Sequence, residues 1–458
     1  MPFSTRRGIA AVALALLVAA DAVAQAEEGD ERVNEAVEDP FDPFEGMDAN
    51  GRIPRPERPP GIEHPRRWRY IPEGRIKSGN VFQRFLVSSA IVPFIFRDED
   101  VGFGGGVALT DIDFRQQRRR EFLGAFVSYS AQGQQSYTFA WRRWVHSFDL
   151  PEGGVLQEER SFWRASAGYR KTRTRRFYGF GPDTDEDDET SYTDERVEFE
   201  LGVQASYPDP GDDLILRLGL RGDFHDLSDG AVKGVPTTEE EFPRVFASAE
   251  NDDLGWLEVG AAWDTRDSQR NPYRGWLLSA DIDAAIAQSD LDAGAVTTFW
   301  GSKIVPLPGL LHRGGDPDEE NPPTDTLALG LRLQLSAGEL PFFALPSLGG
   351  GDHLRGYVAG RWRDRASWFG VVEYRFWVIP RGFRIPFTRT IRVERVGLAG
   401  FYEAGSVARG GSELFRAQVH HSYGVGLRIL LERAAPFRVD VGFSDEDIIV
   451  TAKFGLSF

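Results

Sequence analysis

Repeated short segments in which every second residue is apolar constrain the fold of this chain more than any other feature. Val197, Phe199 and Leu201 alternate with charged or small residues, and the segments Leu214–Leu220 and Leu327–Leu335 repeat the pattern. Because side chains on a strand point alternately to opposite faces, each segment has one apolar wall and one mostly polar wall. Similar segments recur from Phe85 to Phe458 and predict about sixteen strands.

The polar walls decide between two kinds of all-β fold. A soluble sandwich packs its apolar inner faces together and keeps its outer faces polar. A barrel in lipid turns its apolar face outward and keeps its charges inside, which fits charged residues that recur on one face of so many strands. We therefore predict a transmembrane antiparallel β-barrel over residues 85–458, with a loop at residues 338–364 folded into its lumen.

Aromatic residues cluster at the ends of the predicted strands, as the interface girdles of a membrane barrel require. The alternative is that the same aromatics anchor a soluble β-core. The residues are Trp141, Trp144, Trp263, Trp276, Trp300, Trp368, Trp377, Tyr207 and Tyr273.

The N-terminal part divides into two predicted regions. Residues 1–26 have the charged, apolar and small-residue zones of a secretory signal peptide. An uncleaved anchor is the alternative, although the apolar run Gly8–Ala20 is shorter than the roughly 20 residues that a spanning helix needs. Residues 27–84 are first acidic and then rich in Pro and Arg, without a sustained period, and predict a disordered periplasmic extension.

Composition and local motifs argue against several classes of function. The net charge of −17 argues against a nucleic-acid partner, which requires a basic face. The chain has 0 Cys, so disulfides cannot hold it together. Gly102–Gly106 is rich in glycine, but it opens a strand and not a helix, so it does not predict a phosphate-binding loop. His353 and the pair His420–His421 have no partners at metal-ligand spacing. We predict no cofactor, no metal site and no catalytic residue, and therefore no enzyme.

Three motifs in the predicted barrel resemble those of a known family. Trp263-Asp264-Thr265-Arg266-Asp267 with Asn271-Pro272-Tyr273-Arg274-Gly275-Trp276 resembles a turn between central strands. Leu348–Tyr357 with Arg361 resembles a sixth extracellular loop, and Phe401–Gly405 resembles the strand-thirteen motif that receives its arginine. The chain is thus similar to the Omp85 superfamily, the bacterial surface antigen type that includes the BamA and TamA assembly proteins. Weaker matches are Tyr178–Pro182 and the C-terminal signal of Phe454, Leu456 and Phe458, where Lys453 replaces a common glycine.

The resemblance implies two groups of structural site residues. The first is a loop-to-barrel lock in which Arg355 reaches carboxylates on inward-facing strand positions; it comprises Arg355, Gly356, Tyr357, Glu373, Glu403 and Gly405. The family usually has Asp where this chain has Glu403. The alternative is that Arg355 is a solvated loop residue. The second group is the turn motif, which comprises Asp264, Arg266, Asp267, Pro272 and Gly275.

The resemblance also implies a function and a location. The expected role is assembly or insertion of outer-membrane proteins by an integral outer-membrane barrel. The segment before Phe85 is too short and irregular for a POTRA module, which such proteins carry. The alternative is a channel or transporter for small solutes or polypeptides through the lumen. An outer-membrane enzyme is a third hypothesis, but the sequence shows no constellation of catalytic residues for it. Expected partners are outer-membrane lipids and lipopolysaccharide, with nascent outer-membrane proteins or assembly factors.

Overall fold

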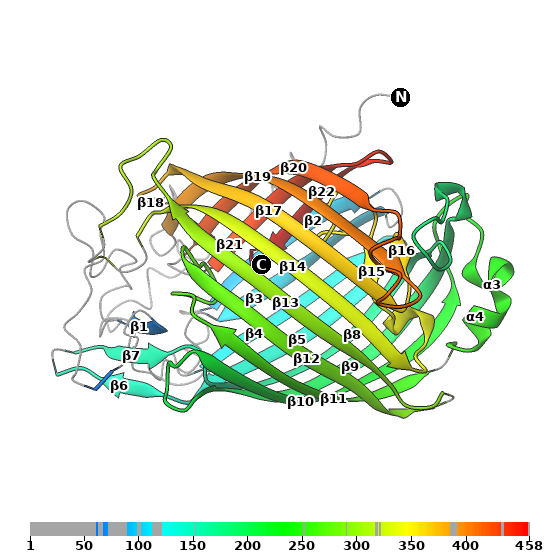
Figure 1. Ribbon diagram of the computed structural model, residues 1–458, viewed down its shortest axis with the longest axis horizontal. Coiled ribbons are helices and arrows are strands. Elements are labelled where there is room, and N and C mark those ends of the chain that lie inside the picture. The colour runs from blue at the N-terminus through cyan, green and yellow to red at the C-terminus, as the bar shows by residue number, and fades with distance from the viewer. Residues whose placement is uncertain are drawn as a thin grey trace, which may run out of the picture.

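The computed structural model describes residues 61–62, 67–71, 89–98, 102–111, 121–151, 153–250, 252–289, 291–316, 319, 322–384, 392–431 and 435–456. Within them, one antiparallel sheet curls into a closed barrel (Figure 1). Fifteen ladders join sixteen strands in chain order. The predicted all-β barrel of about sixteen strands is confirmed.

The strands of the barrel have the following bounds: β2 (Ser89–Asp98), β3 (Gly102–Asp111), β4 (Glu121–Ser130), β5 (Gln135–Trp144), β8 (Phe162–Phe177), β9 (Thr190–Tyr207), β10 (Leu214–Asp229), β11 (Asp253–Asp264), β12 (Gly275–Gln288), β13 (Gly294–Leu307), β14 (Asp325–Gly338), β17 (Ala366–Ile379), β19 (Arg392–Ala408), β20 (His420–Leu431), β21 (Ala435–Phe443) and β22 (Ile448–Phe454). The two-residue β18 (Phe383–Arg384) pairs with β19.

The ladders differ in length around the wall. Strands β9 and β10 pair over sixteen positions, whereas β21 and β22 pair over seven. The β3–β4 ladder also has seven pairs, so these two ladders are the shortest of those that join the sixteen described barrel strands. Because each paired position contributes to the backbone hydrogen-bond ladder, the C-terminal strand is held by few such bonds.

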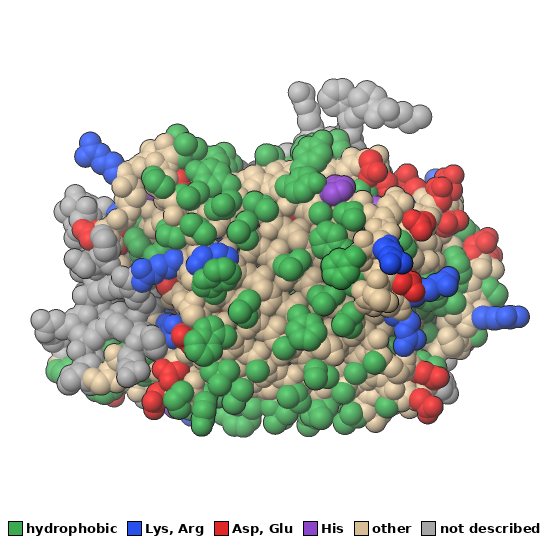
Figure 2. Space-filling view, viewed as in Figure 1, with side chains coloured by type: hydrophobic (Ala, Val, Ile, Leu, Met, Phe, Trp, Pro, Cys, Tyr) green, Lys and Arg blue, Asp and Glu red, His purple; other side chains and the backbone are tan. Residues whose placement is uncertain are grey.

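Apolar side chains are spread over the face of the barrel that Figure 2 shows, and charged side chains gather toward its two ends. Leu201, Leu218 and Leu331 are each more than half exposed, and Tyr423 and Val425 are 59% exposed. A contiguous apolar surface of this extent marks a face that is not meant for water. The alternating pattern of the sequence therefore places its apolar wall outward.

Three of the expected girdle aromatics do not lie on this surface. Trp300 packs on the inner wall, against the buried cluster that includes Leu354 and Phe369. Trp144 and Trp377 are only 7% and 8% exposed. The indole of Trp377 donates to the carbonyl of Thr324 at 3.1 Å, and Arg270 lies over the ring of Trp144 at 5.7 Å. Connections between strands fold over the rings of Trp144 and Trp377, so the girdle expectation was wrong for these two residues and for Trp300.

The two ends of the barrel differ in their connections. At the turn end, short segments such as residues 208–213 and 265–274 join the strands. The loop end carries α3 (Thr238–Glu241), α4 (Pro243–Ala247), η4 (Glu186–Asp188), η5 (Phe342–Ala344) and the hairpin of β15 (Ser347–Leu348) and β16 (Trp362–Arg363) (Figure 1). No helix in the described part of the chain is long and apolar enough to cross a bilayer.

A small second sheet lies at the turn end (Figure 1). It consists of β1 (Trp68–Ile71), β7 (Val155–Glu158) and β6 (Ser147–Asp149), in that order. Strand β1 belongs to the region expected to lack structure, so part of that region is ordered, because backbone groups of β7 pair with it. The predicted signal peptide lies outside the described residues.

Candidate functional site

The long connection between β14 and β17 turns back into the lumen because glycines shape its tip. Gly349 and Gly350 have φ values of 102° and 105°, which other residues rarely adopt. A Cβ atom on Gly349 would lie 2.2 Å from the carbonyl oxygen of Val358. The amide of Gly350 donates to the carbonyl of Tyr357 at 2.9 Å and closes a compact loop over residues 350–357.

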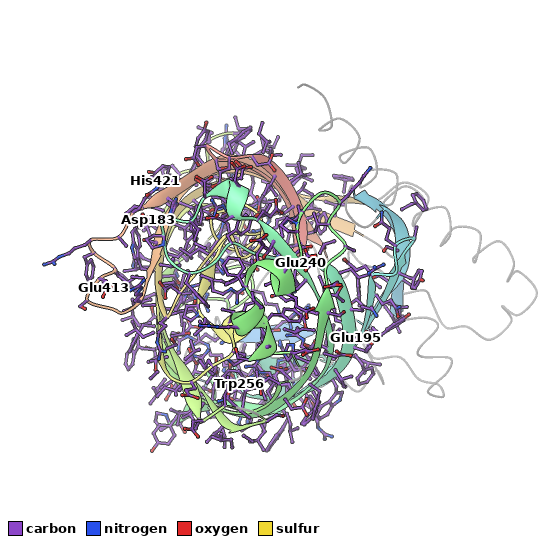
Figure 3. All side chains as sticks on the ribbon, turned by 90° about the vertical axis from the view of Figure 1, so that its right-hand side faces the viewer. Asp183, Glu195, Glu240, Trp256, Glu413 and His421 are labelled. Carbon is purple, nitrogen blue, oxygen red and sulfur yellow. The ribbon has the colours of Figure 1, made fainter. Side chains whose placement is uncertain are left out.

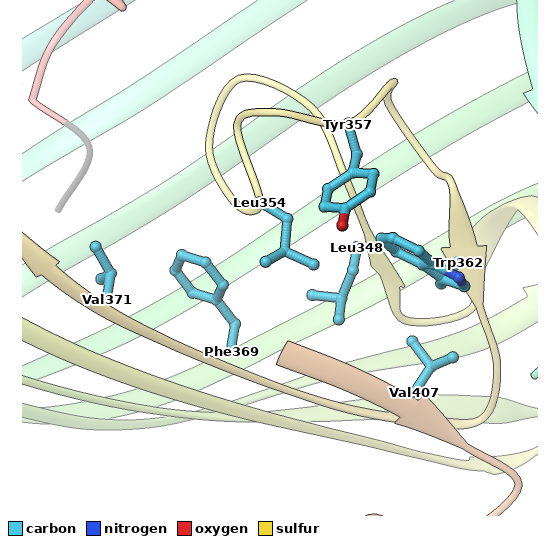
Figure 4. Packing of buried hydrophobic residues seen from close by; sticks show 7 residues of the cluster. All are labelled: Leu348, Leu354, Tyr357, Trp362, Phe369, Val371 and Val407. Carbon is cyan, nitrogen blue, oxygen red and sulfur yellow. The ribbon is translucent and has the colours of Figure 1, made fainter. Parts of the chain in front are cut away.

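An apolar cluster attaches this loop to the inner wall (Figure 4). Leu348, Leu354, Tyr357 and Trp362 of the loop are at most 2% exposed. They face inward-pointing side chains of β17 and β19, so this part of the lumen is filled with side chains. The wall residues of the cluster are Phe369, Val371 and Val407.

Arg355 lies at the centre of the attachment, where it contacts three buried carboxylates. Its Nε and backbone N donate to the two oxygens of Glu403 at 2.8 and 2.7 Å. Its other nitrogens donate to Glu373 at 2.9 Å and to Asp440 at 3.0 Å. The guanidinium also lies over the ring of Phe401, 3.4 Å from its centroid. A planar fork with five donors suits such an arrangement better than an ammonium does.

Further arginines on the wall strands contact the same carboxylates. Arg375 donates to Glu373 at 2.6 Å, and Arg428 bridges Glu373 at 3.0 Å and Asp440 at 2.6 Å. All these groups are at most 5% exposed. The carboxylates are therefore shared among several cations, which is the arrangement that buried charges need.

Asp440, Arg428 and Arg438 are parts of the site that the sequence interpretation did not identify. Arg438 donates to Asp440 at 2.8 Å and to Asp352 of the loop at 2.7 Å. Residues 438 and 440 share a face of β21, and their opposite charges on a lumen-facing position were the available signal. That signal is common to many lumen positions, so it did not single out this strand.

Two glycines allow the backbones of loop and wall to approach closely. A Cβ atom on Gly356 would lie 2.6 Å from the backbone of Phe443, and one on Gly442 would lie 2.3 Å from the carbonyl oxygen of Arg355. A Cβ atom on Gly405 of β19 would lie 2.8 Å from the carbonyl oxygen of Trp368 on the neighbouring strand and 3.0 Å from the side chain of Leu348 of the loop. Larger residues at these positions would push the loop away from the wall.

A second set of contacts holds the loop near its outer end. The hydroxyl of Tyr357 donates to Asp445 and lies 3.2 Å from the carbonyl oxygen of His421. Arg361 donates to Glu446 at 2.8 Å and to the carbonyl of Thr184 at 2.9 Å. The Tyr178–Pro182 segment joins this group, since Tyr178 lies 4.4 Å from the Arg361 guanidinium.

Burial and neighbouring charges shift the pKa values of loop residues. Burial alone would lower the pKa of Arg355, but Glu403, Glu373 and Asp440 raise it above its ordinary value, so the guanidinium stays charged. Burial, together with Arg332, lowers the pKa of His353 to about 3. His353 is accordingly neutral in the docked loop.

The turn motif lies at the opposite end of the barrel, between β11 and β12. Arg266 donates to both oxygens of Asp264 at 3.0 Å, and Asp267 accepts from the amides of Tyr273 and Arg274 at 3.1 Å. Gly275 has φ of 114°. The turn motif and the loop-to-barrel lock thus lie in different parts of the barrel. Pro272 of the turn motif lines a small cavity together with Arg375 and Arg428 of the wall.

The turn motif is connected to the small sheet through Arg160. This buried side chain donates to the carbonyls of Asp264 at 2.5 Å and Arg266 at 2.7 Å. Its backbone amide donates to Glu158 of β7 at 2.7 Å. Burial lowers the pKa of Arg160 to about 10, with Asp264 opposing that effect.

The residues of the expected C-terminal signal have different positions. Phe454 is the last residue of β22 and pairs with Phe437. Leu456 follows the strand and lines the small cavity at the turn end. Phe458 lies outside the described residues.

Known proteins resemble this chain in sequence and in structure. A family model described as the Omp85 superfamily domain matches residues 124–458. No curated protein matches the sequence. Among solved structures, BamA from Haemophilus ducreyi lacking POTRA domains 1-3 is similar at 13% identity and a TM-score of 0.45, over 81% of this chain and 70% of that one. CdiB from Acinetobacter baumannii is similar at 12% identity and a TM-score of 0.46, over 80% and 59%.

Proposed function

Since this chain belongs to the Omp85 superfamily, we propose that its outer-membrane barrel assists the assembly or insertion of other outer-membrane proteins. In this proposal the turn end and the N-terminal extension face the periplasm, and the loop end faces outward. Nascent barrel strands, and any assembly factors that deliver them, are the partners. Lipids and lipopolysaccharide surround the apolar wall.

The unequal support of the barrel wall is the observation that carries the proposal. Arg355 fastens the loop tip to β17, β19 and β21 through one carboxylate on each strand. Asp352 of the same tip pairs with Lys453 of β22 at 2.6 Å, but both side chains are partly exposed. Tyr357 and Arg361 also hold the β21–β22 connection through Asp445 and Glu446. Along the strands themselves, the loop therefore braces β17, β19 and β21 through buried ion pairs and β22 through a partly exposed one.

A short, weakly held terminal strand is suited to pair with an incoming strand. The β21–β22 ladder has seven paired positions, which is less than half of the sixteen between β9 and β10. A sheet edge that opens offers unpaired backbone groups, and such groups bind another strand readily. We infer that β22 is the edge used for a client, with the loop-to-barrel lock keeping the neighbouring wall in register.

A reconstituted folding assay tests this function. The purified protein in lipid vesicles should accelerate the folding of a urea-denatured client barrel, measured as the heat-modifiable band on a gel. An engineered disulfide between Val441→Cys and Val450→Cys, which pair across β21 and β22, should suppress that acceleration, because it stops β22 from moving relative to the braced wall to meet a client. The matched control joins β9 and β10 through Val203→Cys and Leu218→Cys. Equal client folding in protein-free vesicles would contradict the proposal.

A channel is the second candidate, because the wall opposite the loop is lined by partly exposed ion pairs. Arg164 contacts Glu200 at 2.6 Å, and Arg217 contacts Asp281 at 2.9 Å, with side chains 26–37% exposed. Partly exposed charges on the inner wall are typical of a hydrated lumen. A solute or a polypeptide could pass along β8–β12 while the loop stays docked on β17–β21.

Single-channel recording separates the two candidates. A large and steady conductance, with no acceleration of client folding, would favour the channel. A small conductance together with client folding would favour assembly. Arg164→Gln with Arg217→Gln should change the ion selectivity of a conducting lumen and leave client folding unchanged.

A further inference from the structure

The connection between β19 and β20, residues 409–419, folds over the outside of the barrel instead of over its opening. The exposure of outward-facing residues along β19 shows where the connection covers the wall. Tyr402 is 50% exposed, but Ser406 and Ala408, further along the same face, are 0% and 3% exposed. The hydroxyl of Ser406 donates to the carbonyl of Gln418. The connection thus covers the upper part of the outer wall.

Leu414 holds this connection against the wall. It is 1% exposed and packs in a cluster with outward-facing residues of three adjacent strands, and a Cβ atom on Gly411 would contact Leu335 at 3.1 Å. The wall residues of this cluster are Leu333, Leu335, Ala366, Trp368 and Ala408. Figure 3, which faces the loop end, shows Glu413 on the outer side of the ring of strands. The connection is therefore adjacent to the band of the barrel that faces lipid.

The side chains next to Leu414 combine one apolar group with two cations. Phe415 is 93% exposed, more than any other large hydrophobic residue in the described ranges. Arg409 and Arg416 are also exposed, and Glu413 is the single acidic residue between positions 409 and 419. His421, labelled in Figure 3, lies nearby on the same wall. Its ring stacks on Tyr402, with a hydrogen bond of 2.7 Å to the Tyr402 hydroxyl.

We propose that residues 409–419 bind a phosphate-bearing lipid of the outer leaflet. Phe415 inserts beside the acyl chains, and Arg409 and Arg416 contact the phosphate groups. Aromatic rings with a polar neighbour settle at the lipid–water boundary, and arginines near it attract anionic headgroups. The apolar wall continues directly under the connection, so lipid is already beside Phe415. This inference rests on the barrel's lying in the outer membrane.

The absence of cysteine makes a direct test possible, because one introduced thiol can be labelled alone. Phe415→Cys, labelled with an environment-sensitive fluorophore, is measured in vesicles of phosphatidylcholine with and without lipopolysaccharide. Emission should shift to shorter wavelength, and a lipid-borne quencher should act more strongly than aqueous iodide. The matched control is Phe180→Cys, an exposed aromatic of the loop end whose ring packs edge-on against the buried Phe177. A label at position 415 that iodide quenches as fully as the label at 180 would overturn the proposal.

Two further measurements separate the possible failures. Leu218→Cys labels the middle of the apolar wall; if iodide also reaches that label freely, the barrel is not in lipid and the proposed function fails as well. Arg409→Gln and Arg416→Gln should each weaken the binding of lipopolysaccharide by about fivefold, as expected for one cation at an anionic surface. Unchanged binding of lipopolysaccharide in the Arg409→Gln, Arg416→Gln double variant would overturn the phosphate contact. If the connection instead binds an extracellular protein, iodide should quench the label at position 415 freely in vesicles.

Discussion

At the scale of single residues, Arg355 determines how the loop is held. It is fully buried and is paired with carboxylates on three strands that are distant in sequence. Removing one partner of a buried ion pair costs about 3–5 kcal/mol, because the remaining charges stay buried without compensation. The loop and the wall are thus coupled through one side chain.

Replacing Arg355 by Lys should release the loop tip while the barrel still forms. A lysine has three donors on one nitrogen and cannot reach three carboxylates in a plane. We expect faster hydrogen exchange and new protease cleavage at residues 349–357. Arg365→Lys is the control, since Arg365 lies on the same connection but is exposed. Identical exchange in both variants would show that Arg355 does not hold the loop.

Replacing Asp440 by Asn should weaken the same attachment from the wall side. Asp440 accepts from Arg355, Arg428 and Arg438, so its neutralisation leaves three buried cations short of one negative charge. Thermal unfolding of the barrel should begin at a lower temperature than in Asp226→Asn, an exposed carboxylate on β10. A variant as stable as the control would exclude Asp440 from the network.

Acid should loosen the loop through His353. Its pKa is about 3 when docked against an ordinary value of 6.5, so a proton binds better to the undocked loop. The contribution of neutral His353 is complete above about pH 6.5 and is lost as the pH falls toward 3. Arg332 faces the ring, with Asp352 and Lys453 nearby. Exchange at residues 350–357, corrected for intrinsic rates, should rise between about pH 7.5 and 5; His353→Gln should remove most of that rise.

At the scale of elements, the β11–β12 turn depends on one glycine. Gly275 has a positive φ, and a Cβ atom there would lie 2.5 Å from the Cα of Arg266. Gly275→Ala should lower the temperature at which the folded band disappears on a gel, because a strained backbone position costs about 1–3 kcal/mol. Gly400→Ala is the control, since a Cβ atom on Gly400 would have no other atom within 4 Å among the described residues. Equal transition temperatures would contradict the assigned strain.

The sequence predicted elements better than it predicted their attachments. Alternation identified the strands of the barrel because side-chain direction on a strand is a local property. It did not identify β1, whose residues lack a strand pattern and are ordered by pairing with β7. Nor did it reveal that residues 409–419 turn outward, because Leu414 finds its apolar partners on β14 and β17. Those partners are distant in sequence.

At the scale of the whole molecule, the two walls of the barrel should tolerate charge differently. Leu218→Arg places a cation on the apolar wall and should cost about 2–4 kcal/mol at the middle of a bilayer. Ser166→Arg places the same charge on the inner wall opposite Glu200, where a partner is available. Equilibrium unfolding in vesicles should therefore separate the two variants. Equal losses would mean that the outer wall does not face lipid.

The sequence by itself determined the all-β barrel of about sixteen strands, and its motifs, through their resemblance to a known family, indicated the turn motif and the loop that carries Arg355. A period of two and short motifs are local features, and they persist whatever the rest of the chain does. The resemblance already implied that Arg355 reaches Glu373 and Glu403, and the structure places both at its guanidinium. Only the tertiary structure decided that Asp440 joins them and that the connection after β19 lies on the outer wall. These contacts depend on the register of successive strands and on closure of the sheet. A shift of one residue in the register of a strand would turn its side chains to the other face.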